Sequence, residues 1–200
     1  MARRVATRRV TRLSFEGGTV RVDDPPADLD LAWVERDPRT GTARAPGHRY
    51  PDLRAALDER GVDYEDAVLD APALDLTTTY ELRAYQREAL TAWRENGDRG
   101  VLELPTGSGK TVVAVAAMAA LGVPTLVVVP TVDLLDQWRG ELETEFDRAV
   151  GQFGGGVQEA APLTVSTYDS AYLRADDVGD RFGFVVFDEV HHLGGEGYRD

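Results

Sequence analysis

Residues 104–111, Leu-Pro-Thr-Gly-Ser-Gly-Lys-Thr, decide the fold of this chain. They lie between a short apolar run at 100–104 and an alanine-rich run at 110–121, a pattern that predicts a strand, a glycine-rich loop and a helix. Glycines allow backbone N–H groups to turn inward around an anion, and the N-terminus of a helix adds partial positive charge. The stretch therefore predicts a phosphate-binding loop. The alternative is a glycine-rich turn without a ligand.

Two side chains of this loop have specific expected roles. Lys110 would reach the β- and γ-phosphates of ATP, and the Thr111 hydroxyl would bind Mg²⁺. Lys110 is the one lysine among 22 basic residues, which fits a site that needs a compact ammonium group and not a planar guanidinium. The residues predicted to bind the nucleotide here are Thr106, Gly107, Ser108, Gly109, Lys110 and Thr111.

An acidic pair follows the apolar run at 182–187. A carboxylate at the C-terminal end of a buried strand can hold Mg²⁺, which we predict for Asp188. Glu189 is placed to orient or deprotonate the attacking water. The predicted catalytic residues are Lys110, Asp188 and Glu189, and the predicted metal ligands are Thr111 and Asp188. The alternative is a chance acidic pair at a strand end, and the phosphate-binding loop upstream argues against it.

From Tyr80 onward, helix and strand patterns alternate along the chain. Continuous β-branched runs, such as the one at 124–129, are typical of strands buried on both faces. We predict helices at 82–95, 110–121 and 132–150, and strands at 100–104, 124–129, 163–166 and 182–187. This alternation predicts an α/β domain at 79–200 with a parallel sheet covered by helices on both faces.

The first 78 residues have a different pattern. Residues 1–12 are predicted to form a flexible basic arm. Alternation at 13–22 around Glu16-Gly17-Gly18 predicts a hairpin, and the pattern at 50–60 predicts a helix. We therefore expect a small α+β domain at 13–78, ahead of the ATP-binding domain.

Composition excludes several classes of protein and site. The chain contains no cysteine, which rules out disulfides and thiolate metal sites. The longest nearly apolar run, 112–123, is too short to span a bilayer, and no apolar stretch follows the basic first residues as a secretory signal requires. We expect a soluble, cytoplasmic protein. His191 and His192 do not predict a metal site, because adjacent side chains point to different faces and no third ligand is evident.

The loop and the segment Asp188-Glu189-Val190-His191-His192 together resemble the XPB-type branch of superfamily 2 DNA helicases, in archaeal form. The first glycine of the general phosphate-loop pattern is Leu104 here, and the remaining Thr-Gly-Ser-Gly-Lys-Thr is similar to the superfamily 2 form. Residues 82–89 resemble that family's glutamine motif, with Ala84 where proline is usual. The resemblance implies that Gln86 binds the adenine edge of ATP. The alternative is a glutamine on a helix surface.

Two further segments resemble DNA-contacting motifs of the same family. They are residues 128–138 and 164–171, and the resemblance implies that Thr131 and Thr167 touch the backbone of one DNA strand. Trp138 is expected in the core and not as a platform for stacked bases. The glycines at 154–156 fit the hairpin that this family usually has.

The resemblance implies an ATP-dependent DNA helicase or translocase that uses ATP and Mg²⁺ and binds DNA at a junction of single strand and duplex. It implies that 79–200 is the first RecA-like domain of a phosphate-loop motor and that a second, absent domain brings the arginine fingers. It also implies a missing strand between the phosphate-loop strand and the Asp188 strand. We therefore expect residues 1–200 to be a fragment that is inactive alone.

Residues 13–75 resemble the family's small N-terminal domain, which is proposed to engage distorted DNA, only in position and rough composition. The alternatives for the whole chain are the motor subunit of a restriction-type translocase, or a remnant that binds nucleotide or DNA without catalysis.

The net charge of −13 is unusual for a DNA-binding protein, because phosphate contacts require lysine and arginine. Of the 22 basic residues, 21 are arginine, and acidic excess with almost no lysine predicts adaptation to high salt. The alternative is an ordinary acidic protein from a GC-rich genome. In molar salt the Debye length falls to about 3 Å, so direct contacts outweigh the field of the whole protein. The acidic balance therefore does not exclude DNA as a partner.

Overall fold

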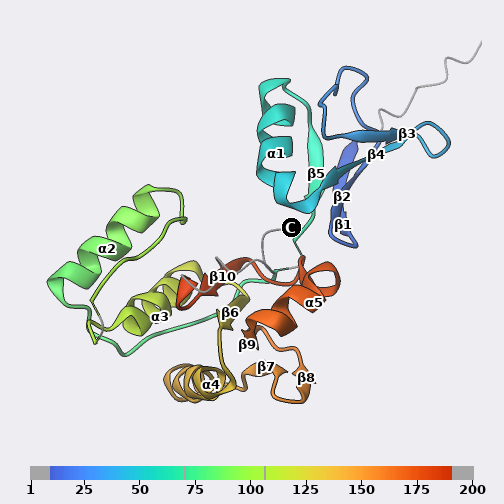
Figure 1. Ribbon diagram of the computed structural model, residues 1–200. Helices are drawn as coiled ribbons and strands as arrows, with labels where there is room; N and C mark the ends of the chain where they lie inside the picture. The colour runs from blue at the N-terminus through green and yellow to red at the C-terminus, as the bar shows by residue number, and fades with distance from the viewer. Residues whose placement is uncertain (1–9, 70, 106, 191–200) are drawn as a thin grey trace, which may run out of the picture. The chain divides into compact units, whose positions relative to one another are not determined.

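The computed structural model describes residues 10–69, 71–105 and 107–190 (Figure 1). The chain divides into two compact units, Met1–Asp70 with Arg174–Arg181, and Ala71–Leu173 with Phe182–Asp200. Each unit contains one five-stranded sheet. The mixed α/β class that the sequence predicts is confirmed at this level.

The N-terminal unit begins with the predicted hairpin. Strand β1 (Thr11–Glu16) pairs antiparallel with β2 (Thr19–Asp23), and the connecting Gly17 and Gly18 have positive φ angles of 54° and 76°. Glycine accommodates such angles without steric cost. Two residues of the predicted arm, Thr11 and Arg12, belong to β1, because Thr11 pairs with β5 and Arg12 pairs with both β2 and β5.

The sheet of the N-terminal unit has the order β3-β4-β2-β1-β5. Helix α1 (Tyr50–Glu59) confirms the predicted helix and buries Leu53 and Leu57 in one core with the apolar faces of β1 and β2. The remaining elements are β3 (Glu35–Asp37), β4 (Thr42–Pro46), the short 3₁₀ helix η1 (Gly47–Arg49) and β5 (Tyr64–Ala67).

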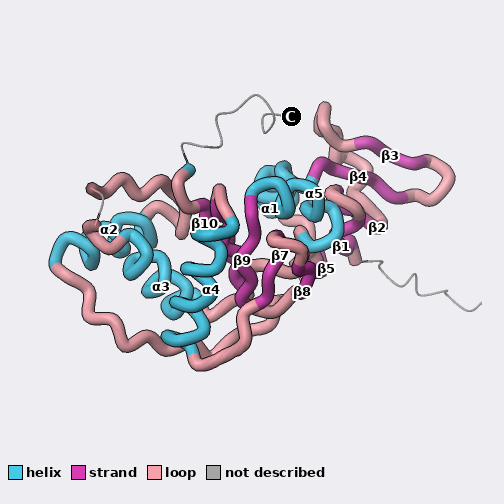
Figure 2. Tube along the Cα trace, turned by 60° about the horizontal axis from the view of Figure 1, so that its bottom comes forward, coloured by secondary structure: helices cyan, strands magenta, loops and turns pink. Residues whose placement is uncertain are grey.

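The second unit contains the predicted parallel strands. Its sheet has the order β10-β6-β9-β7-β8, in which the first four strands are parallel and β8 is antiparallel to β7. Figure 2 shows β9 and β7 side by side, and β6 pairs with the other edge of β9. The strands are β6 (Thr125–Val129), β7 (Gly151–Gly154), β8 (Val157–Glu159), β9 (Leu163–Thr167) and β10 (Phe184–Phe187).

Four helices accompany this sheet: α2 (Ala84–Glu95), α3 (Lys110–Leu121), α4 (Val132–Phe146) and α5 (Tyr168–Val178). Helix α3 has the predicted bounds, and β6 and β9 lie where the sequence places them. Helix α4 ends four residues before the predicted end at 150, because Asp147 adopts a left-handed conformation with φ of 46°. The chain then enters β7, which the apolar pattern alone did not predict.

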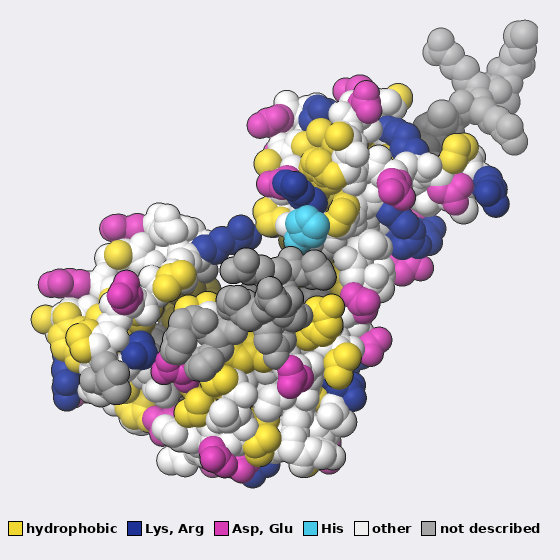
Figure 3. Space-filling model, in the orientation of Figure 1, with side chains coloured by type: hydrophobic (Ala, Val, Ile, Leu, Met, Phe, Trp, Pro, Cys, Tyr) yellow, Lys and Arg dark blue, Asp and Glu magenta, His cyan; other side chains and the backbone are white. Residues whose placement is uncertain are grey.

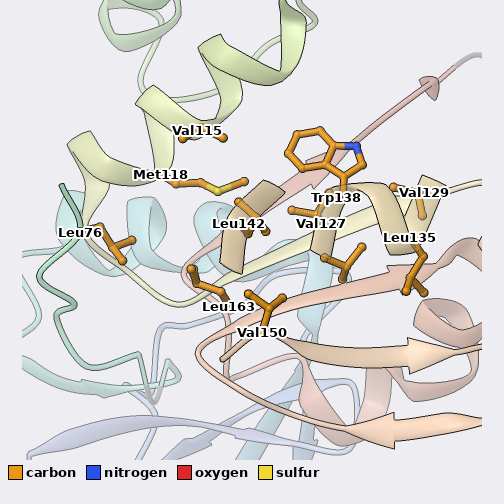
Figure 4. Close-up of a cluster of buried hydrophobic side chains, with 11 residues drawn as sticks. Leu76, Val115, Met118, Val127, Val129, Leu135, Trp138, Leu142, Val150 and Leu163 are labelled. Carbon is orange, nitrogen blue, oxygen red and sulfur yellow. The ribbon is translucent and has the colours of Figure 1, made fainter. Parts of the chain in front are cut away.

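The core of the second unit joins α3 and α4 to β6 and β9 (Figure 4). Val115 and Met118 come from α3, and Leu135, Trp138 and Leu142 from α4. Strand β6 is buried along its whole length, as its continuous β-branched sequence predicts. Burial of these side chains packs α3 and α4 against β6 and is the main driving force for this packing. It thereby fixes the start of α3 within this unit.

Two predicted strands need correction. Residues 100–104 form no strand, and Val101 is 79% exposed. The predicted buried strand at 182–187 is shorter: β10 begins at Phe184, and Val185 and Phe187 are exposed. The physical reason is shared, because within the described residues β10 is paired on one edge only, by β6, and no strand lies between it and 100–104 to supply hydrogen bonds to either.

Across the residues that the structure describes, no helix combines the length and the apolar character needed to cross a membrane.

Candidate nucleotide and magnesium site

The glycine-rich loop before α3 has the backbone geometry of a cradle. Gly107 and Gly109 have φ angles of 76° and 80°, in the left-handed region that favours glycine. A Cβ at Gly109 would lie 2.6 Å from Nε2 of Gln86, so a larger residue there would displace the end of that side chain. Ser108 closes the turn by donating from its backbone N–H and its hydroxyl to the Pro105 carbonyl, at 3.2 and 2.6 Å. Thr106 lies outside the described residues.

The N-terminus of α3 opens directly from this loop. The helix begins at Lys110, and no side chain among the described residues caps it. The first-turn N–H groups of a helix have no partner inside the helix, so they and the helix dipole favour an anion at this end. The ammonium Nζ of Lys110 donates to the Leu104 carbonyl at 3.3 Å, which holds it across the loop.

The acidic pair lies at the C-terminal end of β10, next to β6. The backbone N–H of Asp188 donates to the Val128 carbonyl at 2.9 Å, which ties this end of β10 to the sheet. The carboxylate Oδ1 of Asp188 accepts the backbone N–H of Glu189 at 3.0 Å. Glu189 itself has a φ of 51°, uncommon for a residue with a side chain and a form of strain found most often at functional sites.

An open cavity of about 1220 Å³ is lined both by the start of α3 and by the acidic pair. Lys110 and Thr111 line it from α3, and Asp188 and Glu189 line it from the end of β10. The chemistry of these residues fits ATP with Mg²⁺, because an ammonium group and a helix N-terminus would bind phosphates, and hydroxyl and carboxylate oxygens would bind a hard cation. Among the described residues, no group of three His, Cys, Asp or Glu side chains is placed to hold a metal ion.

Gln86 lies beside the loop and is only 3% exposed. Its Nε2 donates to the Ser108 carbonyl at 2.9 Å and to the Gly109 carbonyl at 3.3 Å, and its Oε1 accepts the backbone N–H of Arg83 at 2.9 Å. Both ends of the amide are therefore bonded to the protein, and a contact with adenine that uses both ends requires that the Nε2 bonds open. The surface alternative for this residue is wrong, because the side chain is buried.

The sequence did not predict that Tyr85 also bonds to the Ser108 carbonyl that Gln86 contacts. The hydroxyl of Tyr85 donates to the Ser108 carbonyl at 2.6 Å, so two neighbouring residues of α2 hold one point of the loop. A smaller cavity of about 190 Å³ lies between this helix and the loop, lined among others by Tyr80, Gln86 and Gly109. A tyrosine next to the glutamine in the segment 82–89 was the available signal.

The segment before α2 is fixed to α4 by carboxylates. A hydrogen bond to Glu141, reinforced by burial, raises the pKa of Tyr80 to about 12, so this hydroxyl stays protonated at neutral pH. Burial acts to raise the pKa of Glu145, but hydrogen bonds from Thr78 and Thr79 outweigh it and hold that pKa below its ordinary value. These bonds hold one wall of the smaller cavity in place.

The two threonines predicted to contact DNA lie at the same edge of the sheet as Asp188. Thr167 ends β9, Thr131 lies two residues beyond the end of β6, and Asp188 follows β10, so all are at the carboxyl ends of parallel strands. The glycine hairpin between β7 and β8 adjoins them: a Cβ at Gly154 would lie 3.0 Å from Thr167. The structure thus confirms a hairpin at the glycines 154–156, while His191 and His192 lie outside the described residues.

The sequence matches two known protein families, one in each part of the chain. Residues 79–200, more than half of the chain, match the family described as "Type III restriction enzyme, res subunit". The chain belongs to this family. A second match, over residues 13–68, is to the "Xeroderma pigmentosum group B helicase damage recognition domain". Together the two matches confirm the resemblance to XPB-type helicases that the sequence motifs indicate.

The relatives with similar sequences are named as XPB or Rad25 proteins. The "DNA 3'-5' translocase XPB2" of Sulfurisphaera tokodaii is 44% identical over 151 residues, which is 75% of this chain and 34% of that protein. A protein of Haloarcula marismortui with the name Rad25 is 36% identical over 168 residues, 81% of this chain and 25% of that protein. The "DNA 3'-5' helicase XPB" of Mycobacterium tuberculosis is 36% identical over 126 residues, 57% of this chain and 23% of that protein. The chain thus spans 23–34% of the length of these relatives.

Proposed function

We propose that this chain forms the ATP-binding part of an XPB-type DNA helicase or translocase, which hydrolyses ATP to move on DNA. The observation that carries the proposal is the convergence of Lys110, Thr111, Asp188 and Glu189 on one cavity. We further propose that 79–200 is a RecA-like motor domain and that 13–78 is a separate domain that engages DNA. The match over 13–68 favours this branch over a restriction-type motor, whose family description fits residues 79–200 alone.

The chemistry assigns a separate task to each of these side chains. The loop N–H groups and the helix N-terminus bind the phosphates, and Lys110 exchanges the Leu104 carbonyl for a phosphate oxygen. Thr111 and Asp188 hold Mg²⁺, which when bound neutralises charge on the transferred phosphoryl group. Glu189 orients the attacking water and accepts its proton. Asp188 and Glu189 follow the carboxyl end of β10, the edge at which parallel α/β sheets bind ligands.

DNA binding is proposed at the same edge of the sheet, through Thr131 and Thr167. On the face shown in Figure 3, basic and acidic side chains of the described residues are interspersed and do not form a continuous basic stripe. We propose contact through hydroxyl and backbone groups, because high salt screens long-range electrostatic attraction. We expect DNA affinity to fall less steeply with salt than for a protein that neutralises many phosphates.

The proposed function is tested with the full-length polypeptide that contains this chain. ATP hydrolysis is measured in molar KCl with and without single-stranded DNA, and strand displacement is measured on a duplex with a 3′ overhang. DNA-stimulated hydrolysis supports the motor proposal. Binding of ATP or DNA without any hydrolysis supports the alternative of a non-catalytic remnant. Movement along duplex DNA without strand separation supports a translocase of the restriction type.

Substitution of Gln86 by alanine is expected to weaken ATP binding and to reduce the preference for ATP over GTP. The side chain supports the loop through Ser108 and Gly109, and a site that pairs one base edge rejects the other by leaving polar groups unpaired. The measurement is kcat/KM for ATP and for GTP in the variant and in the parent. An equal loss for both nucleotides would assign Gln86 to loop support alone. Glu88→Ala, on the same helix, is the matched control.

A further inference from the structure

The buried indole of Trp138 bonds to the proposed magnesium ligand. Trp138 lies in α4, is 4% exposed and packs in the core of its unit. Its Nε1–H donates to Oδ2 of Asp188 at 2.7 Å, while Oδ1 accepts the backbone N–H of Glu189 at 3.0 Å. Each carboxylate oxygen thus accepts one fixed donor, and the remaining lone pairs are directed by these bonds. Trp138 is therefore part of the core and part of the acidic site at once.

A second aromatic residue holds the backbone of Asp188. Tyr168, the first residue of α5, is buried, and its hydroxyl donates to the Asp188 carbonyl at 2.8 Å. Its ring stacks on that of Phe187, with centroids 6.2 Å apart and planes at 16°. Strand β10 is paired on one edge only among the described residues, so these contacts add restraint to a strand end that the sheet holds weakly.

Each aromatic donor belongs to a helix that begins at a proposed DNA contact. Thr131 caps α4, and its Oγ1 accepts the backbone N–H of Leu134 at 3.3 Å. Thr167 directly precedes α5, and its Oγ1 accepts the backbone N–H of Ser170 at 3.4 Å. Trp138 lies about 10 Å along α4 from its cap, at the rise of an α-helix. A helix of this length moves as a rigid body, so displacement of its cap displaces the donor.

We propose that Trp138 and Tyr168 are positioning residues that couple DNA contact at Thr131 and Thr167 to the orientation of Asp188. The inference rests on the proposed function, because it assigns the magnesium and DNA sites as above. DNA that shifts either cap would move a donor relative to the carboxylate and change how Asp188 holds Mg²⁺. Coupling of this kind travels through hydrogen bonds and rigid elements, and it is reciprocal. Bound Mg·ADP must then change DNA affinity by the same factor as DNA changes Mg·ADP affinity.

The test uses phenylalanine variants of the full-length polypeptide, which keep an aromatic side chain and remove the donor; Trp138→Phe also replaces the indole by a smaller ring. For Trp138→Phe and Tyr168→Phe, calorimetry measures the affinity for ADP with Mg²⁺ and with EDTA, and anisotropy of labelled single-stranded DNA is measured with and without Mg·ADP. Trp33→Phe in the N-terminal unit and Tyr172→Phe, 56% exposed on α5, are the matched controls. Thermal unfolding is measured for every variant.

We expect Trp138→Phe to lower the affinity for Mg·ADP by about 10–100-fold, the usual effect of losing a group that orients a metal ligand. The affinity for ADP in EDTA and the affinity for DNA without nucleotide should be unchanged. The factor by which Mg·ADP alters DNA affinity should fall toward one in both variants. A merely structural role would not change the ratio of Mg·ADP to ADP affinity.

Two results would overturn the inference. One is an unchanged ratio of Mg·ADP to ADP affinity together with unchanged coupling in both variants. The other is an equal loss of affinity for Mg·ADP, ADP and DNA in proportion to the loss of thermal stability. That result would mean that both residues only stabilise the core. If the parent protein binds no Mg·ADP at all, the proposed function fails instead, and that result is seen before any variant is compared.

Discussion

Replacing Lys110 by alanine is expected to abolish ATP hydrolysis and to weaken ATP binding in the full-length polypeptide. Lys110 is the only lysine in the chain, it is the first residue of α3, and its Nζ already spans the loop to the Leu104 carbonyl. Loss of one preorganised donor from a reacting site costs about 10²–10³ in rate, and the charge of this one meets the phosphates directly. We therefore expect a fall of at least about a thousandfold.

Lys110→Arg separates charge from shape. The guanidinium is planar and wider than an ammonium group, so restoring the charge should not restore the rate. Arg94→Ala, which removes a half-exposed cation from α2, is the control and should hydrolyse ATP normally. Hydrolysis and calorimetric ATP affinity are measured for all three variants. Parental turnover in Lys110→Ala would show that the phosphate-binding loop has been assigned wrongly.

The signals that predicted the fold correctly are local in sequence. The loop and the bounds of α3 follow from glycine spacing and an apolar run, and the N-terminal hairpin follows from Gly17 and Gly18. The buried strand β6 follows from five consecutive apolar or β-branched residues. These features need no information about distant parts of the chain, which explains why a single sequence was sufficient for them.

The failures concern pairing between distant segments. Residues 100–104 have a strand-like composition, but a strand forms only where a neighbour offers an edge, and none is present beside them in the described residues. The same absence leaves Phe187 exposed on β10, although its apolar sequence predicts burial. Apolar composition therefore predicted that both segments favour buried strands. It did not predict whether a neighbouring strand is present to pair with them.

The candidate site shows the same limit at the level of side chains. The chemistry of Lys110, Thr111, Asp188 and Glu189 was predicted from motifs, and the structure brings them to one cavity. The bond from Trp138 to Asp188 joins residues 50 positions apart, and no spacing rule predicts it. The prediction that Trp138 lies in the core is confirmed, but its indole N–H has a partner there because a buried tryptophan usually finds one.

Glu189→Gln is expected to lower ATP hydrolysis by about 10²-fold or more while Mg·ATP still binds. A positioned general base contributes about 10²–10⁴ in rate, and glutamine keeps the size of the side chain without its basicity. Glu189 lines the cavity beside Asp188, and its backbone N–H holds Oδ1 of Asp188. Because that bond is made by the backbone, the substitution leaves the proposed magnesium ligand in place.

The measurement separates binding from chemistry. Calorimetry gives the affinity for Mg·ATP, and single-turnover hydrolysis gives the rate of the chemical step in the same variant. Glu143→Gln, which removes a half-exposed carboxylate from α4, is the control. The left-handed backbone at Glu189, with φ of 51°, imposes the same demand on glutamate and glutamine, and thermal unfolding is measured for both proteins. Parental turnover in Glu189→Gln would mean that Glu189 serves structure through its backbone N–H alone and that another group activates the water.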